Sequence, residues 1–162
     1  MTDIRIRDYQ HSDAEDLNRI AVSAFDQFRD QYQDWPAMLA GLSKTSALSA
    51  TGEIIVVEFQ KQFAGAVVYF GPNSRKAPFF DQRWPVIRML VVDPAFRAKG
   101  LGRALSTECI ARAKHDGSAI IALHTSPIMT VALPMYLRMG FVKAYDAPPI
   151  FGVAYAVYTK AL

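Results

Sequence analysis

A short basic loop with two glycines, Arg97-Ala98-Lys99-Gly100-Leu101-Gly102, carries the residue types in this sequence that best suit binding of an anion. A stretch with helical spacing follows it. The first backbone N–H groups of a helix have no partner inside the helix, and the helix dipole adds partial positive charge there. Gly100 and Gly102 remove the Cβ atoms that would keep a bulky ligand off the backbone. With the charges of Arg97, Lys99 and Arg103, the loop predicts a phosphate or pyrophosphate site.

A strand and a helix must hold this loop in place. Val86–Val92 is an apolar run of strand formers that is interrupted only by Arg88, and Asp93-Pro94 ends it because proline cannot donate to a sheet ladder. A helix of about four turns then runs to near Gly117. On it Leu105, Cys109 and Ala113 recur at four-residue steps, which predicts that this face packs on a sheet.

Two common phosphate-binding patterns do not fit the loop. The P-loop pattern G-x-x-x-x-G-K-[ST] is absent, and Leu105 stands where the dinucleotide fingerprint needs its third glycine. What remains is V-D-P-x-x-R-x-x-G-x-G, residues 92–102. This phrase resembles motif A of the GCN5-related N-acetyltransferases (GNAT), which hold the pyrophosphate of coenzyme A in such a loop.

A second phrase strengthens the resemblance. Ala132–Phe141 reads A-L-P-M-Y-L-R-M-G-F and is similar to the family motif A-x-x-x-Y-x-x-x-G-F, in the order and at the spacing that the family has. The resemblance extends over Ile4 to Leu162, and its specific part runs from Val86 to Phe141.

Composition agrees with a single globular domain over residues 1–162. Hydrophobic residues make up 51% and charged residues 20% of the chain, and no apolar run approaches the ~20 residues that span a bilayer. The N-terminus lacks the apolar core of a signal peptide, and a single cysteine allows no disulfide within the chain, so we expect a cytoplasmic protein. We expect that cysteine, Cys109, to be a small buried hydrophobic residue. The net charge of +3 is dispersed, and we therefore expect neither a nucleic-acid nor a membrane partner.

The resemblance implies a fold and a reaction. The fold is α/β, a GNAT-like mixed and mostly antiparallel sheet of about seven strands with helices on both faces. The reaction is transfer of the acetyl group of acetyl-coenzyme A, the cosubstrate, to a primary amine. Because no positioned nucleophile is visible, we expect direct attack in a ternary complex. Dimers are common in the family, so a homodimer is compatible with the resemblance.

The resemblance also implies roles for particular residues. Tyr136 would lie near the coenzyme sulfur, and a backbone N–H near Leu90, Val91 or Val92 would serve the oxyanion and the pantetheine arm, where the family's strands splay apart. The family's asparagine in the loop after His124 is missing, and Ser126 is the substitute. The cofactor-binding residues expected are Leu90, Val91, Val92, Arg97, Ala98, Lys99, Gly100, Leu101, Gly102, Arg103 and Ser126.

The acceptor side is less defined. We expect Phe79, Phe80 and Trp84 in the loop Gly71–Pro85 to shape an acceptor pocket, with packing onto the core as the alternative. The resemblance also implies that the helix opened by Pro36 and the loop before it form one wall of the acceptor site. We therefore expect Phe28, Tyr32 and Trp35 to meet substrate, with covering of the sheet edge as the alternative.

The general base stays open between Glu58, Asp81 and His124. The acceptor also stays open among antibiotics, polyamines, amino acids, peptide N-termini and lysine side chains. The three histidines are widely spaced and form no zinc pattern, so no metal is expected.

Two rival functions remain at this stage. One is a non-catalytic acyl-coenzyme A sensor with the same fold, and the other is a nucleic-acid-associated protein that uses the basic loop for backbone phosphate.

Near the C-terminus, we expect closing strands at Phe141–Tyr145 and Val153–Thr159 that are separated by a turn at Pro148-Pro149.

Overall fold

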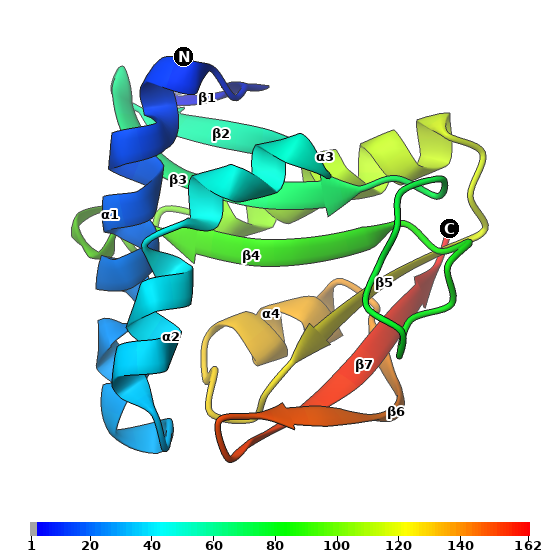
Figure 1. The fold of residues 1–162 in the computed structure, drawn as a ribbon. Helices are drawn as coiled ribbons and strands as arrows, with labels where there is room; N and C mark the ends of the chain where they lie inside the picture. Colours follow the sequence, from blue (N-terminus) through cyan, green and yellow to red (C-terminus); the bar gives the residue numbers. More distant parts are fainter. Residues whose placement is uncertain (1–2) are drawn as a thin grey trace.

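A seven-stranded sheet runs through the molecule in this computed structural model, which describes residues 3–162 (Figure 1). The strand order is β1-β2-β3-β4-β5-β7-β6, and β4 and β5 are the only parallel neighbours among the described residues. The prediction of a mixed, mostly antiparallel sheet is thus confirmed. The strands are β1 (Ile4–Asp8), β2 (Glu53–Phe59), β3 (Gln62–Phe70), β4 (Val86–Val92), β5 (Ile120–Thr125), β6 (Val142–Ile150) and β7 (Val153–Ala161).

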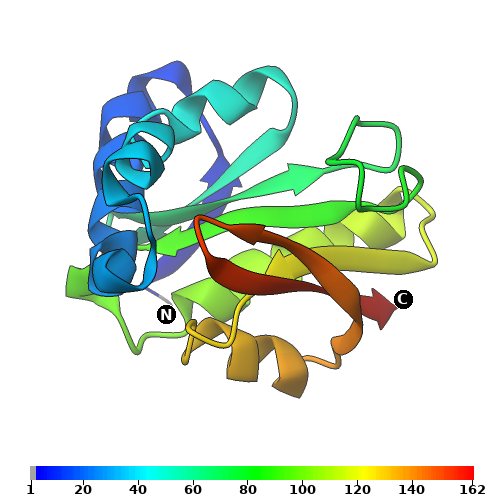
Figure 2. The same ribbon diagram turned by 60° about the horizontal axis from the view of Figure 1, so that its bottom comes forward.

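Helices cover both faces of this sheet (Figure 2). One face carries α1 and α2, and the other carries α3 and α4, so the sheet separates two hydrophobic cores. The helices are α1 (Ala14–Phe25), α2 (Trp35–Leu42), α3 (Leu101–His115) and α4 (Ala132–Arg138). Short 3₁₀ helices lie at His11–Asp13, Asp26–Gln31, Thr45–Ala50 and Pro94–Phe96.

The long helix α3 packs as its sequence pattern predicts. Leu105, Cys109 and Ala113 have no exposed surface, and they belong to a core that β2, β3, β4 and β5 share with α3. Complete burial of a leucine side chain contributes about 1.5–3 kcal/mol to folding. Burial also raises the pKa of the Cys109 thiol well above its ordinary value, so this cysteine behaves as the small hydrophobe expected.

Prolines open two of the helices. Pro36 lies in the first turn of α2, where the Asp34 carboxylate accepts a hydrogen bond from the Ala37 N–H at 3.0 Å. Pro134 falls in the first turn of α4, where its missing N–H leaves no helical hydrogen bond unmade. Both helix starts therefore agree with the sequence-based prediction.

The prediction of a turn at Pro148-Pro149 is wrong. Both prolines lie inside β6, and the chain turns instead at Phe151 and Gly152, which have φ values of 42° and 79°. Because β6 is the outermost strand, one of its edges needs no ladder hydrogen bonds, and a register shift between Ala147 and Ile150 accommodates the prolines.

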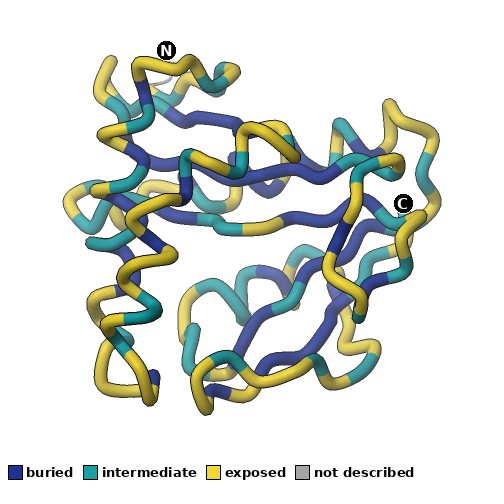
Figure 3. Tube along the Cα trace, viewed as in Figure 1, coloured by how far each residue is buried: buried dark blue, intermediate teal, exposed yellow. Residues whose placement is uncertain are grey.

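Burial follows the layers of the fold. Figure 3 shows the middle strands of the sheet as the most buried parts of the chain and β6 as largely exposed. Among residues 3–162, no helix combines the length and the apolar character that crossing a membrane requires.

Candidate functional site

The parallel strands β4 and β5 separate soon after they meet. Their ladder consists of the pairs Val86↔Ala122 and Ile87↔Leu123, and beyond these the two strands diverge toward their carboxyl ends (Figure 1). At the same point the β3–β4 register shifts, and Met89 adopts a φ of 55°. A bulge of this kind bends the strand and increases its local twist, which helps to separate β4 from β5. Residues 87–90 of β4 and 123–125 of β5 line the resulting slot, which is part of a larger cavity.

The basic loop enters α3 with unpaired backbone donors. The first hydrogen bond of the helix runs from the Ala104 N–H to the Gly100 oxygen at 3.0 Å. The N–H groups of Leu101, Gly102 and Arg103 precede it, and they meet no acceptor within residues 3–162. Gly100 has a φ of 77°, and a Cβ atom there would meet nothing within 4 Å. Free donors and open space at a helix start are the features that an anion site requires.

Within residues 3–162, no acidic side chain pairs with the cations around the turn. Arg97 and Arg103 are exposed, and neither forms an ion pair with a residue in the described part of the chain. The Lys99 ammonium lies 5.1 Å above the centre of the Phe59 ring. This cation–π contact is weak at an exposed position, so Lys99 can swing toward a phosphate at small cost.

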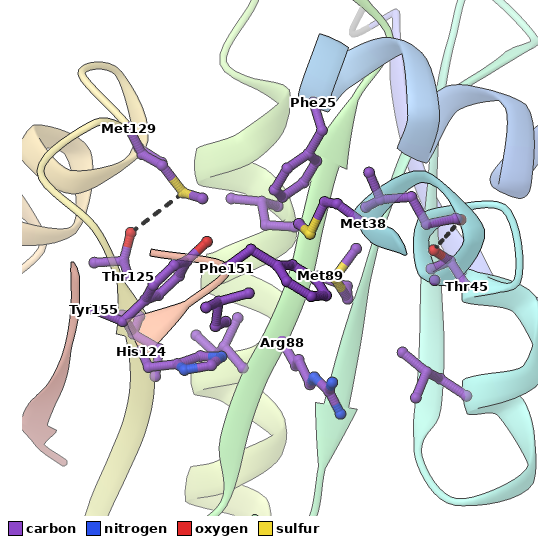
Figure 4. Close-up of a pocket in the computed structure, with 18 of the residues that line it drawn as sticks. Phe25, Met38, Thr45, Arg88, Met89, His124, Thr125, Met129, Phe151 and Tyr155 are labelled. Atoms are coloured by element: carbon purple, nitrogen blue, oxygen red, sulfur yellow. Dashed lines mark hydrogen bonds between the residues drawn. The ribbon is translucent and has the colours of Figure 1, made fainter. Parts of the chain in front are cut away.

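A cavity of about 420 Å³ opens beside the divergent strands (Figure 4). Its walls come from α1 and α2, the 3₁₀ helix Thr45–Ala50, β4, β5, α4 and the β6–β7 turn. Most of the lining is apolar, and neither aspartate nor glutamate lines it among the described residues. Its apolar side chains include Phe25, Met38, Leu42, Leu48, Met89 and Met129.

Tyr136 lies at the wall that α4 contributes. Its side chain is 5% exposed, lines the cavity and packs edge-to-face on Phe141 with ring centres 5.6 Å apart. Burial raises the pKa of the Tyr136 phenol well above 10, so the phenol keeps its proton and acts as a hydrogen-bond donor at neutral pH.

His124 lines the same cavity from the end of β5. Its ring contacts those of Phe79, Phe80 and Tyr155 at centroid distances of 5.2, 5.7 and 5.2 Å. Its Nδ1 atom is buried and has no hydrogen-bond partner in residues 3–162. Burial, with a smaller effect of the Arg88 charge, lowers the pKa of His124 to about 4, so the ring is neutral near pH 7.

The other two candidates for a general base lie elsewhere and are paired. Glu58 accepts a hydrogen bond from Arg7 at 2.7 Å, in a cluster that joins β2 to β1. Asp81 is held by Arg83, and their hydrogen bond lowers the pKa of Asp81 to about 2. Neither carboxylate lines the cavity, so His124 is the candidate that the structure brings to it.

The aromatic residues expected to shape an acceptor pocket do not reach the surface of the cavity. Phe79 and Phe80 support His124 from outside, and they and Trp84 pack against the core without lining the cavity. For these three residues the expected pocket role is wrong and the packing alternative holds.

The aromatic residues before α2 behave in the same way. Phe28, Tyr32 and Trp35 do not line the cavity, and the Tyr32 hydroxyl shares a hydrogen bond with that of Tyr155. The helix α2 itself does form a wall of the cavity, through Met38 and its neighbours.

Most of the predicted cofactor-binding residues lie along the end of β4 and the basic loop that follows it, whereas Ser126 lies elsewhere. Leu90 lines the cavity, and Val91 and Val92 continue β4 from there into the basic loop. Ser126 lies apart from the cavity surface. It is 1% exposed, and its hydroxyl accepts a hydrogen bond from the Ile128 N–H at 3.3 Å.

No local pattern in the sequence singled out Met89 or Met129 as lining residues, whereas Met38 lies on the helix that the resemblance placed at the acceptor site. Met38 lies on α2, Met89 on β4 and Met129 in the loop between β5 and α4, so the three meet only in the folded chain. Arg88 did carry a signal, since it interrupts an apolar strand, but sequence reasoning gave it no role.

Comparison with known proteins gives one match to a family profile. The profile of the Acetyltransferase (GNAT) family matches residues 10–141. No protein with a curated function matches the sequence significantly.

Solved structures share the fold over their whole length. A GCN5-related N-acetyltransferase (aminotransferase, class II) from Rhodopseudomonas palustris is similar with a TM-score of 0.78 and 20% identity, over 100% of this chain and 98% of the other. A ribosomal-protein-alanine N-acetyltransferase from Brucella melitensis has a TM-score of 0.70 and 18% identity, over 98% and 99%. A GNAT family acetyltransferase from Elizabethkingia anophelis with acetyl-CoA bound has a TM-score of 0.67 and 18% identity, over 100% of both chains.

Proposed function

Because the chain belongs to the acetyltransferase (GNAT) family, we propose that it transfers the acetyl group of acetyl-coenzyme A to a primary amine by direct attack in a ternary complex. The observation that carries this proposal is the row of unpaired N–H groups at Leu101, Gly102 and Arg103, which opens onto the slot between β4 and β5. A site for a diphosphate therefore continues directly into a channel for a narrow chain.

Acetyl-coenzyme A fits this arrangement. Its pyrophosphate takes the N–H groups at the start of α3, and Arg97, Lys99 and Arg103 supply full charges around it. The open space at Gly100 lets a phosphate approach the backbone closely. The pantetheine arm lies in the slot, where the free edge of β4 offers N–H and C=O groups to its amides.

The reacting end of the donor then lies where the slot meets the cavity. A backbone N–H near Leu90 stabilises the negative charge that develops on the thioester oxygen. Tyr136 donates a hydrogen bond to the sulfur as the carbon–sulfur bond breaks. Since burial keeps the phenol protonated, it is ready as a donor in every enzyme molecule at neutral pH.

The acceptor amine enters through the cavity. Its nitrogen forms a bond to the carbonyl carbon, the thiolate leaves, and the proton lost by nitrogen balances the proton gained by sulfur. The amine must be neutral to attack, and neutral His124 accepts its proton directly or through water. Because the pKa of His124 is low, this acceptance is transient and passes the proton on to solvent or thiolate.

The test is an assay of thiol release from acetyl-coenzyme A against a panel of amines, with mass spectrometry of the product. Isothermal titration calorimetry measures binding of acetyl-coenzyme A in parallel. Binding together with amine-dependent thiol release and an amide product supports the proposal. Binding with no acetylated product from any amine identifies an acyl-coenzyme A sensor instead.

A further inference from the structure

Arg88 is a cation on the face of the sheet that looks into the cavity. It pairs with Val68 of β3 and lies two residues after Val86, so it shares the face on which these two valines contribute to the core beneath α1 and α2. Arg88 is exposed and lines the cavity near His124 (Figure 4), and its charge contributes to the low pKa of that ring.

No carboxylate neutralises this arginine. Within residues 3–162 Arg88 forms neither a hydrogen bond nor an ion pair, although Arg7, Arg83 and Arg112 are each held by acidic side chains. A second cationic residue, Lys44, lines the cavity near α2, and no acidic residue of the described chain does so. A guanidinium in this setting matches a planar, bidentate anion, and a carboxylate has that shape.

The rest of the lining indicates the body of the ligand. Met38, Met89 and Met129 contribute flexible thioether side chains, and the other walls are largely aliphatic or aromatic. Such a surface adapts to apolar groups of different shape. The cavity volume of about 420 Å³ suits a small molecule.

We propose that the acceptor is a small amine that carries both an apolar body and a carboxylate, such as an apolar α-amino acid, and that Arg88 binds the carboxylate. This inference rests on the proposed acetyl transfer and specifies its second substrate. The absence of acidic groups from the described lining disfavours a polyamine or aminoglycoside, whose several ammonium groups would face Arg88 and Lys44 with no counter-charge.

The test compares three pairs of acceptors that differ by one carboxylate: leucine and isoamylamine, phenylalanine and phenethylamine, methionine and 3-(methylthio)propylamine. For the wild-type protein, we expect kcat/KM to be about 10- to 100-fold higher for the amino acid of at least one pair, as a charge-assisted bidentate contact permits. Arg88→Gln should remove this preference through a higher KM and leave the affinity for acetyl-coenzyme A unchanged.

Two further variants make the test specific. Arg88→Lys keeps the charge without the planar fork and should retain part of the preference. Arg83→Gln removes an exposed arginine outside the cavity and should retain all of it. Circular dichroism and thermal melting establish that each variant is folded.

The outcomes separate this inference from the proposed function. If the wild type acetylates the decarboxylated amines as well as the amino acids, or if Arg88→Gln retains the preference, the inference is overturned and acetyl transfer stands. If the protein acetylates spermidine and none of the six compounds, the inference is likewise overturned and acetyl transfer stands. If acetyl-coenzyme A does not bind at all, the proposed function itself fails.

Discussion

The backbone of Gly102 lies so close to α4 that a Cβ atom at this residue would stand 3.6 Å from the sulfur of Met135. The same atom would lie 3.6 Å from Leu90 Cδ2, so the first turn of α3, the end of β4 and α4 converge on this glycine. A distance of 3.6 Å is an ordinary van der Waals contact. One extra carbon therefore fits here, and a longer side chain must enter the space beside the slot.

Gly102→Glu is expected to abolish binding of acetyl-coenzyme A, because its side chain occupies this space and its charge repels the diphosphate. Isothermal titration calorimetry measures the loss. The matched control is Gly102→Ala, whose single extra carbon the protein accommodates at ordinary contact distance, so it should weaken binding less than Gly102→Glu does. A folded Gly102→Glu protein that binds the coenzyme with unchanged affinity would contradict the phosphate site.

Tyr136→Phe should lower kcat by about 10- to 100-fold, the cost of losing a hydrogen bond to a developing charge. The affinity for acetyl-coenzyme A should change little, and the fold should remain stable because phenylalanine keeps the packing on Phe141. Single-turnover measurement of thiol release isolates the chemical step. An unaltered rate would remove Tyr136 from the mechanism.

Glu58→Gln should reduce stability without affecting turnover. The carboxylate is 16% exposed and accepts a 2.7 Å hydrogen bond from Arg7, so its neutralisation should cost about 1–3 kcal/mol. Urea unfolding measures this cost, and the amine assay measures kcat. A large fall in kcat with stability preserved would show that Glu58 acts in catalysis.

Acid should destabilise the protein through His124. The pKa of this residue is about 4 in the folded chain against 6.5 ordinarily, so between these values the unfolded chain binds the proton and the folded chain does not. Stability is therefore lost as the pH falls from about 6.5 to 4, by about 3 kcal/mol from this group.

The control for this pH effect is His124→Phe, which keeps a ring against Phe79 and Phe80 and removes the titration. The difference in unfolding free energy between pH 7 and pH 4.5 should be smaller in this variant than in the wild type. Carboxylates elsewhere titrate equally in both proteins and cancel. Equal losses in the two proteins would refute the assignment.

The sequence was most informative where local rules decide the structure. The loop before α3 combines a strand stop, two glycines and three cations, and each of these acts over a few residues. Pro36 and Pro134 likewise fixed helix starts, because proline is tolerated only in the first turn. These features could be placed without knowledge of the tertiary fold.

Features that depend on neighbours across the sheet were not predictable. Pro148 and Pro149 have the composition of a turn, but β6 accepts them because it is an edge strand, which the local sequence does not reveal. Nothing in the local pattern indicates that Met89 takes a positive φ. Phe79 and Phe80 have the residue types of a binding pocket, yet they lie one layer behind it, and only the fold distinguishes these positions.

The brief ladder between β4 and β5 has a mechanical consequence. Only two residue pairs join β4 to β5 among the described residues. The sheet therefore consists of two parts, β1-β2-β3-β4 and β5-β7-β6, which share a short ladder. A coenzyme lying between β4 and β5 would add to this connection by forming hydrogen bonds with β4 and packing against the other part of the sheet. Occupancy should thus stiffen the domain as a whole, and amide protons far from the ligand, on β6 and β7, should exchange more slowly in its presence.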